Sequence, residues 1–154
     1  MNSLIIGSGF GFYGYLPSIY SFSKKIFINK KYKQKYLNLK ILKRFSFKIY
    51  WYKNLYEIIE DVDYLVIALE PSKQVKILKN IFTIKKKFKH IFLEKPINNN
   101  PNNSLMMIRY LKKKGANYSI GFIFEYLKWI KFLRTKKKRE NFKIVWTVKK
   151  KKFF

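Results

Sequence analysis

Four glycines fall within residues 7–14, directly after the first apolar stretch of this chain. That stretch, residues 3–6, predicts a short strand, and the apolar spacing after Gly14 predicts a helix from Tyr15 to about Ser23. A strand, a glycine-rich turn and a helix in this order can bind a dinucleotide. The turn lets the backbone approach a pyrophosphate, and the helix N-terminus offers unpaired N–H groups. The segment therefore predicts a nucleotide-binding turn within an α/β fold.

The turn departs from the usual G-x-G-x-x-G pattern at its third glycine. Gly7 and Gly9 occupy the first two positions, but Phe12 stands at the third, with Gly11 and Gly14 on either side of it. The alternative is a glycine-rich turn that serves the fold and holds no ligand. The strand before it and the helix after it favour nucleotide binding.

The rest of the chain alternates short apolar runs with helical patterns, which is typical of a doubly wound parallel sheet. The uninterrupted apolar run at residues 63–69 predicts a strand that is buried on both faces. We expect further strands at 25–28, 48–52, 91–93 and 118–122. The fold class predicted is thus α/β and Rossmann-like.

Helices are expected at 55–61, from Pro71 onwards, and after the polar loop 98–103, where Ser104 would cap a helix that stops at Gly115. The basic region 30–44 is ambiguous. If it is helical, one side of it carries Tyr32, Tyr36, Leu39 and Leu42.

The chain of 154 residues has a formal net charge of +27, with 31 Lys but only 4 Arg. Lys, Ile, Asn, Phe and Tyr, which have A/T-rich codons, make up more than half of the residues, so codon bias alone can supply most of this charge. A nucleic-acid-binding protein is expected to cluster its charge and to use Arg for bidentate contacts. These lysines are spread along the chain, so we expect no specific nucleic acid as a partner.

The sequence contains no Cys and one His, which excludes disulfides, Cys-ligated zinc and any multi-His metal site. No apolar run approaches the roughly 20 residues that span a membrane. We therefore expect a cytoplasmic domain with no membrane as a partner and no metal. The lone His90 starts a predicted strand and would lie ~13 Å from the cofactor edge at ~3.3 Å per residue, so we expect no catalytic part for it.

The second predicted strand ends without the acidic residue that reads an NAD ribose about 20 residues after the glycine-rich turn. Its end carries Asn29, Lys30 and Lys31 instead. One interpretation is a preference for NADP, with Lys30 or Lys31 facing the 2′-phosphate. The other is a pair of ordinary surface lysines, since about one residue in five of this chain is Lys. The choice between NAD and NADP stays open.

Glu94, Lys95 and Pro96 close a predicted buried strand at its carboxyl end, where ligands bind in an open α/β sheet. Partial desolvation there would disfavour the charged amine of Lys95, which could then exchange a proton with a substrate hydroxyl. Glu94 could pair with Lys95 or accept a hydrogen bond from a ligand amide. A turn with a solvated ion pair is the simpler alternative for the tripeptide alone.

These motifs follow one another in the order and spacing of the Gfo/Idh/MocA family, named for glucose–fructose oxidoreductase and inositol dehydrogenase. They are the turn at 7–14, the strand at 63–68 with Pro71 soon after it, Glu94-Lys95-Pro96, and Gly121-Phe122 at the end of a later strand. The chain resembles the N-terminal half of that family. The resemblance implies an NAD(P)-binding Rossmann domain over residues 1–122, in an oxidoreductase of sugars, cyclitols or nucleotide sugars.

The resemblance also implies the residues of the site. Lys95 would be the catalytic residue, beside the nicotinamide and the substrate, where it assists hydride transfer. The residues implied to bind NAD or NADP are Gly7, Ser8, Gly9, Phe10, Gly11, Phe12, Lys30, Leu69, Pro71, Glu94 and Lys95. One departure is Val75, which stands where the family has a histidine.

Residues 123–154 are expected to form a linking helix at about 124–133 and the first strand, at 143–148, of a truncated α/β substrate domain. The family's Asp and His of that domain have no counterpart here, so we expect a chain that is incomplete for catalysis by itself. The alternatives are a non-catalytic module that binds the cofactor or a partner, a decayed gene fragment and, less favoured, a basic nucleic-acid-associated protein. A second copy of the chain could pair with an exposed strand at 143–148.

Overall fold

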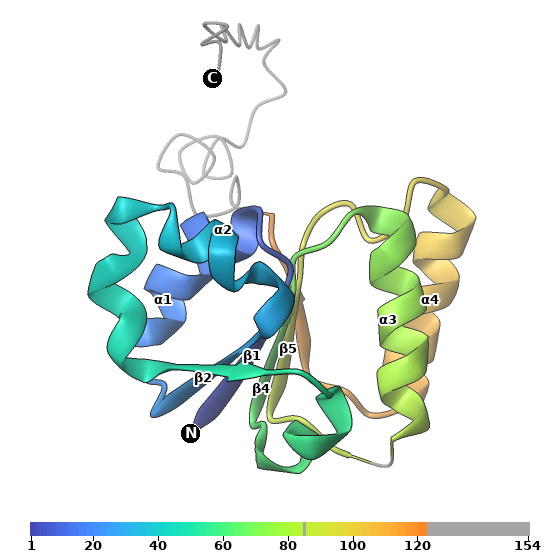
Figure 1. Ribbon diagram of the computed structural model, residues 1–154. Helices are drawn as coiled ribbons and strands as arrows, with labels where there is room; N and C mark the ends of the chain where they lie inside the picture. The colour runs from blue at the N-terminus through green and yellow to red at the C-terminus, as the bar shows by residue number, and fades with distance from the viewer. Residues whose placement is uncertain (85, 123–154) are drawn as a thin grey trace, which may run out of the picture. The chain divides into compact units, whose positions relative to one another are not determined.

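Residues 1–84 and 86–122 are described by the computed structural model, and they form a six-stranded sheet in which all neighbouring strands are parallel. The strand order is β3-β2-β1-β4-β5-β6, so β1 and β4 lie at the centre (Figure 1). The strands are β1 (Asn2–Ile6), β2 (Lys25–Asn29), β3 (Ile49–Tyr52), β4 (Tyr64–Ile67), β5 (His90–Leu93) and β6 (Tyr118–Ile120). This is the doubly wound α/β sheet that the sequence predicts.

Helical segments connect the strands and cover both faces of the sheet (Figure 1). One face carries η1 (Gly11–Tyr15), a π-helical turn that runs on into α1 (Leu16–Tyr20), followed along the chain by η2 (Lys30–Tyr32), α2 (Lys33–Leu37) and η3 (Lys40–Lys48). The other face carries α3 (Pro71–Thr83) and α4 (Pro101–Lys113), and the short turns η4 (Leu55–Glu57) and η5 (Ile59–Asp61) precede β4. The first helix thus begins at Gly11, before its predicted start at Tyr15, and the helix predicted at 55–61 is two short turns.

Two apolar clusters, one on each face of the sheet, hold these layers together. Successive side chains of a strand point to opposite faces, so Leu4 of β1 packs toward α3 and α4 while Ile5 packs toward α1. β4 is buried on both faces, as predicted, since Leu65 and Val66 belong to different clusters and both are fully buried. Burial of each such aliphatic side chain contributes roughly 1.5–3 kcal/mol.

The basic region that is ambiguous in the sequence folds into η2, α2 and η3. Tyr36 and Leu42 are buried in one cluster, and Tyr32 and Leu39 pack against it, so the predicted apolar side is confirmed. The Tyr36 hydroxyl donates a hydrogen bond to the Leu42 carbonyl at 2.5 Å. This bond joins α2 to η3.

The predicted cap of α4 is wrong. The helix begins at Pro101, and Asn100 caps it by accepting hydrogen bonds from the N–H groups of Asn102 and Asn103. Ser104 lies inside the first turn instead. Proline is favoured at the first helical position because its missing N–H is not needed there, so Pro101 opens the helix rather than interrupting a loop.

Residues Met1–Gly121 form one compact unit. The helix predicted at 124–133, the strand predicted at 143–148 and the assignment of 123–154 to a second domain all lie outside the described residues. Within the described part of the chain, no helix has the length and apolar character needed to cross a membrane.

Candidate functional site

The strand order creates a binding position at the carboxyl ends of β1 and β4. The chain leaves β1 toward one face of the sheet and leaves β4 toward the other, so the two loops diverge at this edge. Open α/β sheets bind ligands at such a switch point. The glycine-rich turn follows β1, Leu69 and Pro71 follow β4, and Glu94 and Lys95 follow the neighbouring β5. The topology therefore brings these predicted segments to one edge.

Gly7 and Gly9 meet different demands in the glycine-rich turn. Gly7 has a φ of 120°, and a Cβ added there would overlap the main-chain carbonyl of Ala68, so only glycine fits. Gly9 is exposed, and nothing lies within 4 Å of the position that its Cβ would take. The packing of the chain gives no reason for a glycine at position 9, whereas a ligand lying against the backbone would.

Gly11 takes the packing role of the third glycine. A Cβ on Gly11 would lie 3.0 Å from Ile5 Cγ2 and 3.5 Å from Ala68 Cβ, so the bare backbone lets the helix lie against β1 and the end of β4. Phe12, at the usual third position, is fully buried, and its ring packs edge-on against Tyr36 with 5.7 Å between centroids. The close contact that the pattern assigns to the third glycine is therefore made one residue earlier, at Gly11. The Phe12 ring belongs to the core.

The start of the first helix presents main-chain N–H groups to the same edge. η1 and α1 are continuous, and the N–H groups of Phe12 and Tyr13 donate to the Gly9 carbonyl at 3.0 and 3.5 Å. The N–H groups of Phe10 and Gly11 have no acceptor among the described residues. Unpaired N–H groups and the positive end of the helix dipole both attract an anion.

A hollow of about 330 Å³ lies at the carboxyl ends of β1, β2 and β3. Ile6, Asn29 and Tyr52 from these three strands line it. Burial raises the pKa of Tyr52 to about 12, so its hydroxyl keeps its proton. Lys31 and Lys53 line the same hollow, and none of its lining residues in the described chain is acidic. The hollow therefore combines an apolar wall with two positive charges.

The basic residues near the turn differ in what they face. Lys31 lines the hollow with Asn29, whereas Lys30 lines a neighbouring hollow of about 410 Å³ that shares Tyr52 and Lys53 with it. The Asn29 side chain accepts a hydrogen bond from the Lys31 N–H at 3.0 Å, which fixes the start of η2. Sequence reasoning missed Lys35, whose amine donates to the Ser8 hydroxyl at 3.3 Å and so places a further cation beside the glycine-rich turn. Its spacing of four residues from Lys31 is the signal that could have found it.

The turn at residues 94–97 is held by Gln74, a fully buried residue of α3. The Gln74 amide nitrogen donates to the Glu94 carbonyl at 2.8 Å, and its amide oxygen accepts from the Glu94 N–H at 3.0 Å. The same nitrogen lies 3.4 Å from the carbonyls of Pro96 and Ile97. The Lys95–Pro96 peptide bond is cis. Sequence reasoning did not single out Gln74.

The Glu94 carboxylate lies between the end of β5 and the first helix. Its Oε1 accepts the Lys95 N–H at 2.9 Å, and its Oε2 is buried with no hydrogen-bond partner among the described residues. The Tyr15 hydroxyl donates to the Leu93 carbonyl at 3.3 Å, and burial, with a smaller effect of the Glu94 carboxylate, raises the pKa of Tyr15 to about 12. A buried oxygen without a donor is costly, so Oε2 is suited to accept a hydrogen bond from a ligand.

The Lys95 side chain is exposed and forms no ion pair with an acidic residue of the described chain. The solvated Glu94–Lys95 ion pair is therefore not the arrangement found here, because Glu94 bonds the main-chain N–H of Lys95 instead. Proton exchange between Lys95 and a substrate hydroxyl calls for partial desolvation. A ligand or a further protein surface would have to cover the amine to provide it.

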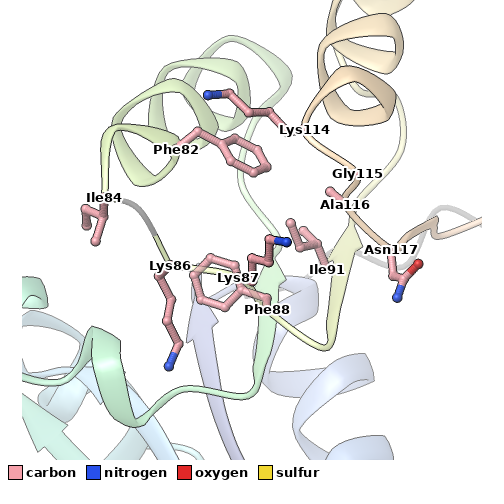
Figure 2. A pocket seen from close by; sticks show the side chains of 10 residues that line it. All are labelled: Phe82, Ile84, Lys86, Lys87, Phe88, Ile91, Lys114, Gly115, Ala116 and Asn117. Atoms are coloured by element: carbon pink, nitrogen blue, oxygen red, sulfur yellow. The ribbon is translucent and has the colours of Figure 1, made fainter.

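Another hollow, of about 310 Å³, lies at the opposite edge of the sheet, near the ends of α3 and α4 (Figure 2). Phe82 and Phe88 give it an apolar lining, and the Lys86 amine points away from the other lining side chains toward an ion pair with Glu60 at 3.8 Å. His90 also begins its strand at this edge, far from the glycine-rich turn, as expected. Across residues 1–84 and 86–122, no cluster of three or more His, Asp or Glu side chains could hold a metal ion.

The groups at the carboxyl edge fit a dinucleotide. The N–H groups of Phe10 and Gly11 have no acceptor among the described residues, and the neighbouring Gly9 is bare, so a pyrophosphate can approach the turn there. The hollow at Asn29 can take an adenosine, and the free oxygen of Glu94 can accept an N–H group such as that of a carboxamide. The fold and these groups together define a nucleotide-binding Rossmann domain.

A comparison with known protein families also indicates a nucleotide-binding Rossmann domain. A model described as an oxidoreductase family with an NAD-binding Rossmann fold, Gfo/Idh/MocA, matches residues 1–122, which is most of the chain. The match includes the glycine-rich turn, β4 and the turn after β5. The chain belongs to the Gfo/Idh/MocA oxidoreductase family, which confirms the resemblance drawn from the motifs.

Solved structures of low sequence identity share the fold. A UDP-N-acetylglucosamine 3-dehydrogenase from Acidithiobacillus ferrooxidans matches with a TM-score of 0.65 and 15% identity, over 86% of this chain and 41% of its own. The 3-ketoreductase KijD10 from Actinomadura kijaniata, solved with NADP, has a TM-score of 0.66 and 14% identity, over 86% and 40%. A super-repressor mutant of Gal80p from Saccharomyces cerevisiae has a TM-score of 0.65 and 14% identity, over 87% and 36%.

This chain thus spans about two fifths of the length of the solved structures that it matches. No curated protein matches its sequence.

Proposed function

We propose that the carboxyl edge of the sheet binds NAD(P) across its width. The pyrophosphate lies on the glycine-rich turn, the adenosine enters the hollow at Asn29, and the nicotinamide extends toward Glu94 and Lys95. The observation that carries this placement is Gly9, an exposed bare backbone beside unpaired N–H groups at a helix start. The chain's own packing does not require glycine there, whereas close approach of a pyrophosphate does.

We propose NADP as the preferred cofactor. Lys31 and Lys53 line the adenosine hollow, where a ribose 2′-phosphate would lie, and Lys35 adds a third cation beside Ser8 of the glycine-rich turn. The acidic residue that bonds a free 2′-hydroxyl in NAD-specific sites is missing among the described residues of this hollow. Positive charges favour the phosphate, and no carboxylate there repels it.

The proposed reaction is hydride exchange with a hydroxyl carbon of a sugar, a cyclitol or a nucleotide sugar. The dinucleotide supplies the hydride chemistry when bound. Lys95 would exchange the proton of the substrate hydroxyl, and Glu94 Oε2 would accept an N–H of the carboxamide and so orient the ring. Tyr15, whose pKa is raised to about 12, keeps its proton and acts as a hydrogen-bond donor rather than a base.

The substrate class is supported by the names of two structures with the same fold, a UDP-N-acetylglucosamine 3-dehydrogenase and a 3-ketoreductase. Lys95 is exposed, and no second acid–base side chain is bonded to it within the described residues. We therefore propose that residues 1–122 hold the cofactor, and that the substrate surface comes from residues outside this described part or from another chain.

A second candidate is a regulator that binds the dinucleotide without turnover. The Gal80p mutant, named as a super-repressor, matches the fold as well as the two enzymes do. Both candidate functions use the same cofactor site, and they differ in whether Lys95 has a catalytic role. An enzyme loses turnover in the Lys95→Ala variant while it retains the cofactor, whereas a regulator has no turnover to lose.

Titration of the purified chain with NADH and NADPH, followed by cofactor fluorescence, tests the proposal. Salt near 0.15 M screens the general attraction of a highly basic chain for phosphates. Saturable binding, tighter for NADPH, is the expected result. Binding that disappears in salt, or that never saturates, would contradict the proposed site.

A further inference from the structure

Gln74 makes more hydrogen bonds to the turn at residues 94–97 than any other side chain in the described part of the protein. Its side chain is fully buried in α3, 20 positions before Glu94. Its amide donates to the Glu94 carbonyl at 2.8 Å and accepts from the Glu94 N–H at 3.0 Å. Gln74 therefore pairs with residue 94 much as a neighbouring strand would.

These bonds lie where β5 ends and the chain leaves the sheet. The Glu94 N–H also reaches the Ile67 carbonyl of β4 at 3.0 Å, which is the last ladder contact on that side. Buried carbonyls beyond this point need a donor that the sheet no longer supplies. A primary amide offers two donors and an acceptor at once, whereas leucine offers neither and a carboxylate lacks the donor.

We propose that Gln74 is a positioning residue that sets Glu94 and Lys95 against the nicotinamide end of the bound dinucleotide. This inference rests on the proposed function. Gln74 is buried and bonds only to main-chain atoms of the turn, so it acts through residue 94 and touches no ligand. The two bonds hold the main chain of Glu94, from which the side chain extends with its buried Oε2, an oxygen that has no partner among the described residues.

The two ends of the dinucleotide should respond differently to a change at Gln74. The glycine-rich turn and the hollow at Asn29 lie at the ends of β1, β2 and β3, and Ile77 is the residue of α3 that lines the hollow. Neither makes a side-chain hydrogen bond to Gln74 among those of the described chain. Loosening the turn after β5 therefore affects contacts to the nicotinamide half. Contacts to the adenosine and pyrophosphate remain.

The test compares NADH with ADP-ribose, which lacks the nicotinamide, in the Gln74→Leu variant. We expect the Kd of NADH to rise roughly tenfold and that of ADP-ribose to change less than about twofold, since only one group of contacts is loosened. Asn80→Leu, which removes an exposed amide from the same helix, is the matched control and should leave both Kd values unchanged. An equal loss for both ligands, or no loss for NADH, would overturn the positioning role.

Amide hydrogen exchange of the ligand-free chain provides a readout that needs no cofactor. Gln74→Leu should speed exchange at residues 94–97 and leave that of β1 unchanged. If the leucine variant does not fold, Gln74→Glu keeps the volume and removes a donor at high pH, and a protonated carboxyl at low pH should restore it. A wild-type chain that binds neither ligand refutes the proposed function and the positioning role with it, and unchanged exchange in a folded variant refutes the positioning role alone.

Discussion

Replacing Gly9 by valine is expected to abolish dinucleotide binding without weakening the fold. Nothing lies within 4 Å of its Cβ position, and the residue is exposed with no left-handed φ. Surface changes of this kind alter the free energy of unfolding by less than about 0.5 kcal/mol. The isopropyl group would instead fill the space through which a pyrophosphate reaches the N–H groups of Phe10 and Gly11.

The size of the binding loss follows from those two N–H groups. Hydrogen bonds to a charged group contribute about 1.5–3 kcal/mol each, so losing both weakens binding by at least about 3 kcal/mol. That loss corresponds to a rise of about 100-fold or more in Kd. The loss of the positive helix end as an anion partner adds to it.

Gly7→Ala is the matched contrast, because its Cβ would overlap the Ala68 carbonyl at a φ of 120°. We expect it to lower the free energy of unfolding by at least the roughly 1–3 kcal/mol that such a strained backbone conformation costs, and the overlap with Ala68 adds to this loss. Urea unfolding and NADPH titration of both variants measure the two effects. A Gly9→Val protein that binds NADPH like the wild type would refute the placement of the pyrophosphate.

Three further outcomes are expected. Lys31→Glu should weaken NADPH binding about tenfold more than NADH binding, whereas Lys30→Glu, at a residue that does not line the adenosine hollow, should leave their ratio unchanged in the same titration. Asn100→Ala should lower the free energy of unfolding in urea by about 1 kcal/mol, because α4 loses its cap. A hydrogen bond from the Asn2 N–H and, as a second cause, the nearby Lys89 lower the pKa of Asp63 in the folded chain. The ionised carboxylate therefore stabilises the fold above pH ~4, and this stability is lost as the pH falls through the lowered pKa. Asp63→Asn should therefore flatten the acid side of a urea-midpoint profile.

The strands could be predicted because short, uninterrupted apolar runs are typical of strands in a buried parallel sheet. The segment predicted at 63–69 is the central strand β4, and the strands predicted up to residue 122 agree with the observed ones within two residues at each end. Helix starts were harder, since both Asn100 and Ser104 are good capping residues. The choice between them depends on Pro101, which favours the first helical position.

The candidate site could be predicted where it consists of local motifs. The glycine-rich turn and the Glu94–Lys95 strand end are such motifs, and the topology brings them to one edge. Gln74 and Lys35 belong to no such motif, and their partners lie 20 and 27 positions away in the sequence, so only weak spacing signals point to them. Gln74 carries a faint signal, since it lies on the same helix face as the buried Leu78.

The role of Phe12 shows why a motif alone was misleading. The pattern requires a glycine where the helix touches the strand, and the contact with Ile5 is made at Gly11 instead. Which residue makes that contact depends on the π-helical turn at the start of the helix, which spacing alone does not show. The phenylalanine at the next position then fills the core between the helix and α2.

Amide-resolved NMR of the chain titrated with NADP⁺ in moderate salt would show where a dinucleotide lies. We expect saturable shifts at Phe10 and Gly11, at Asn29 and at residues 94–95, all at the carboxyl edge of the sheet, and their loss in Gly9→Val. Shifts that grow without saturation over the lysine-rich segments, with none at Phe10 and Gly11, would contradict a dinucleotide site at this edge.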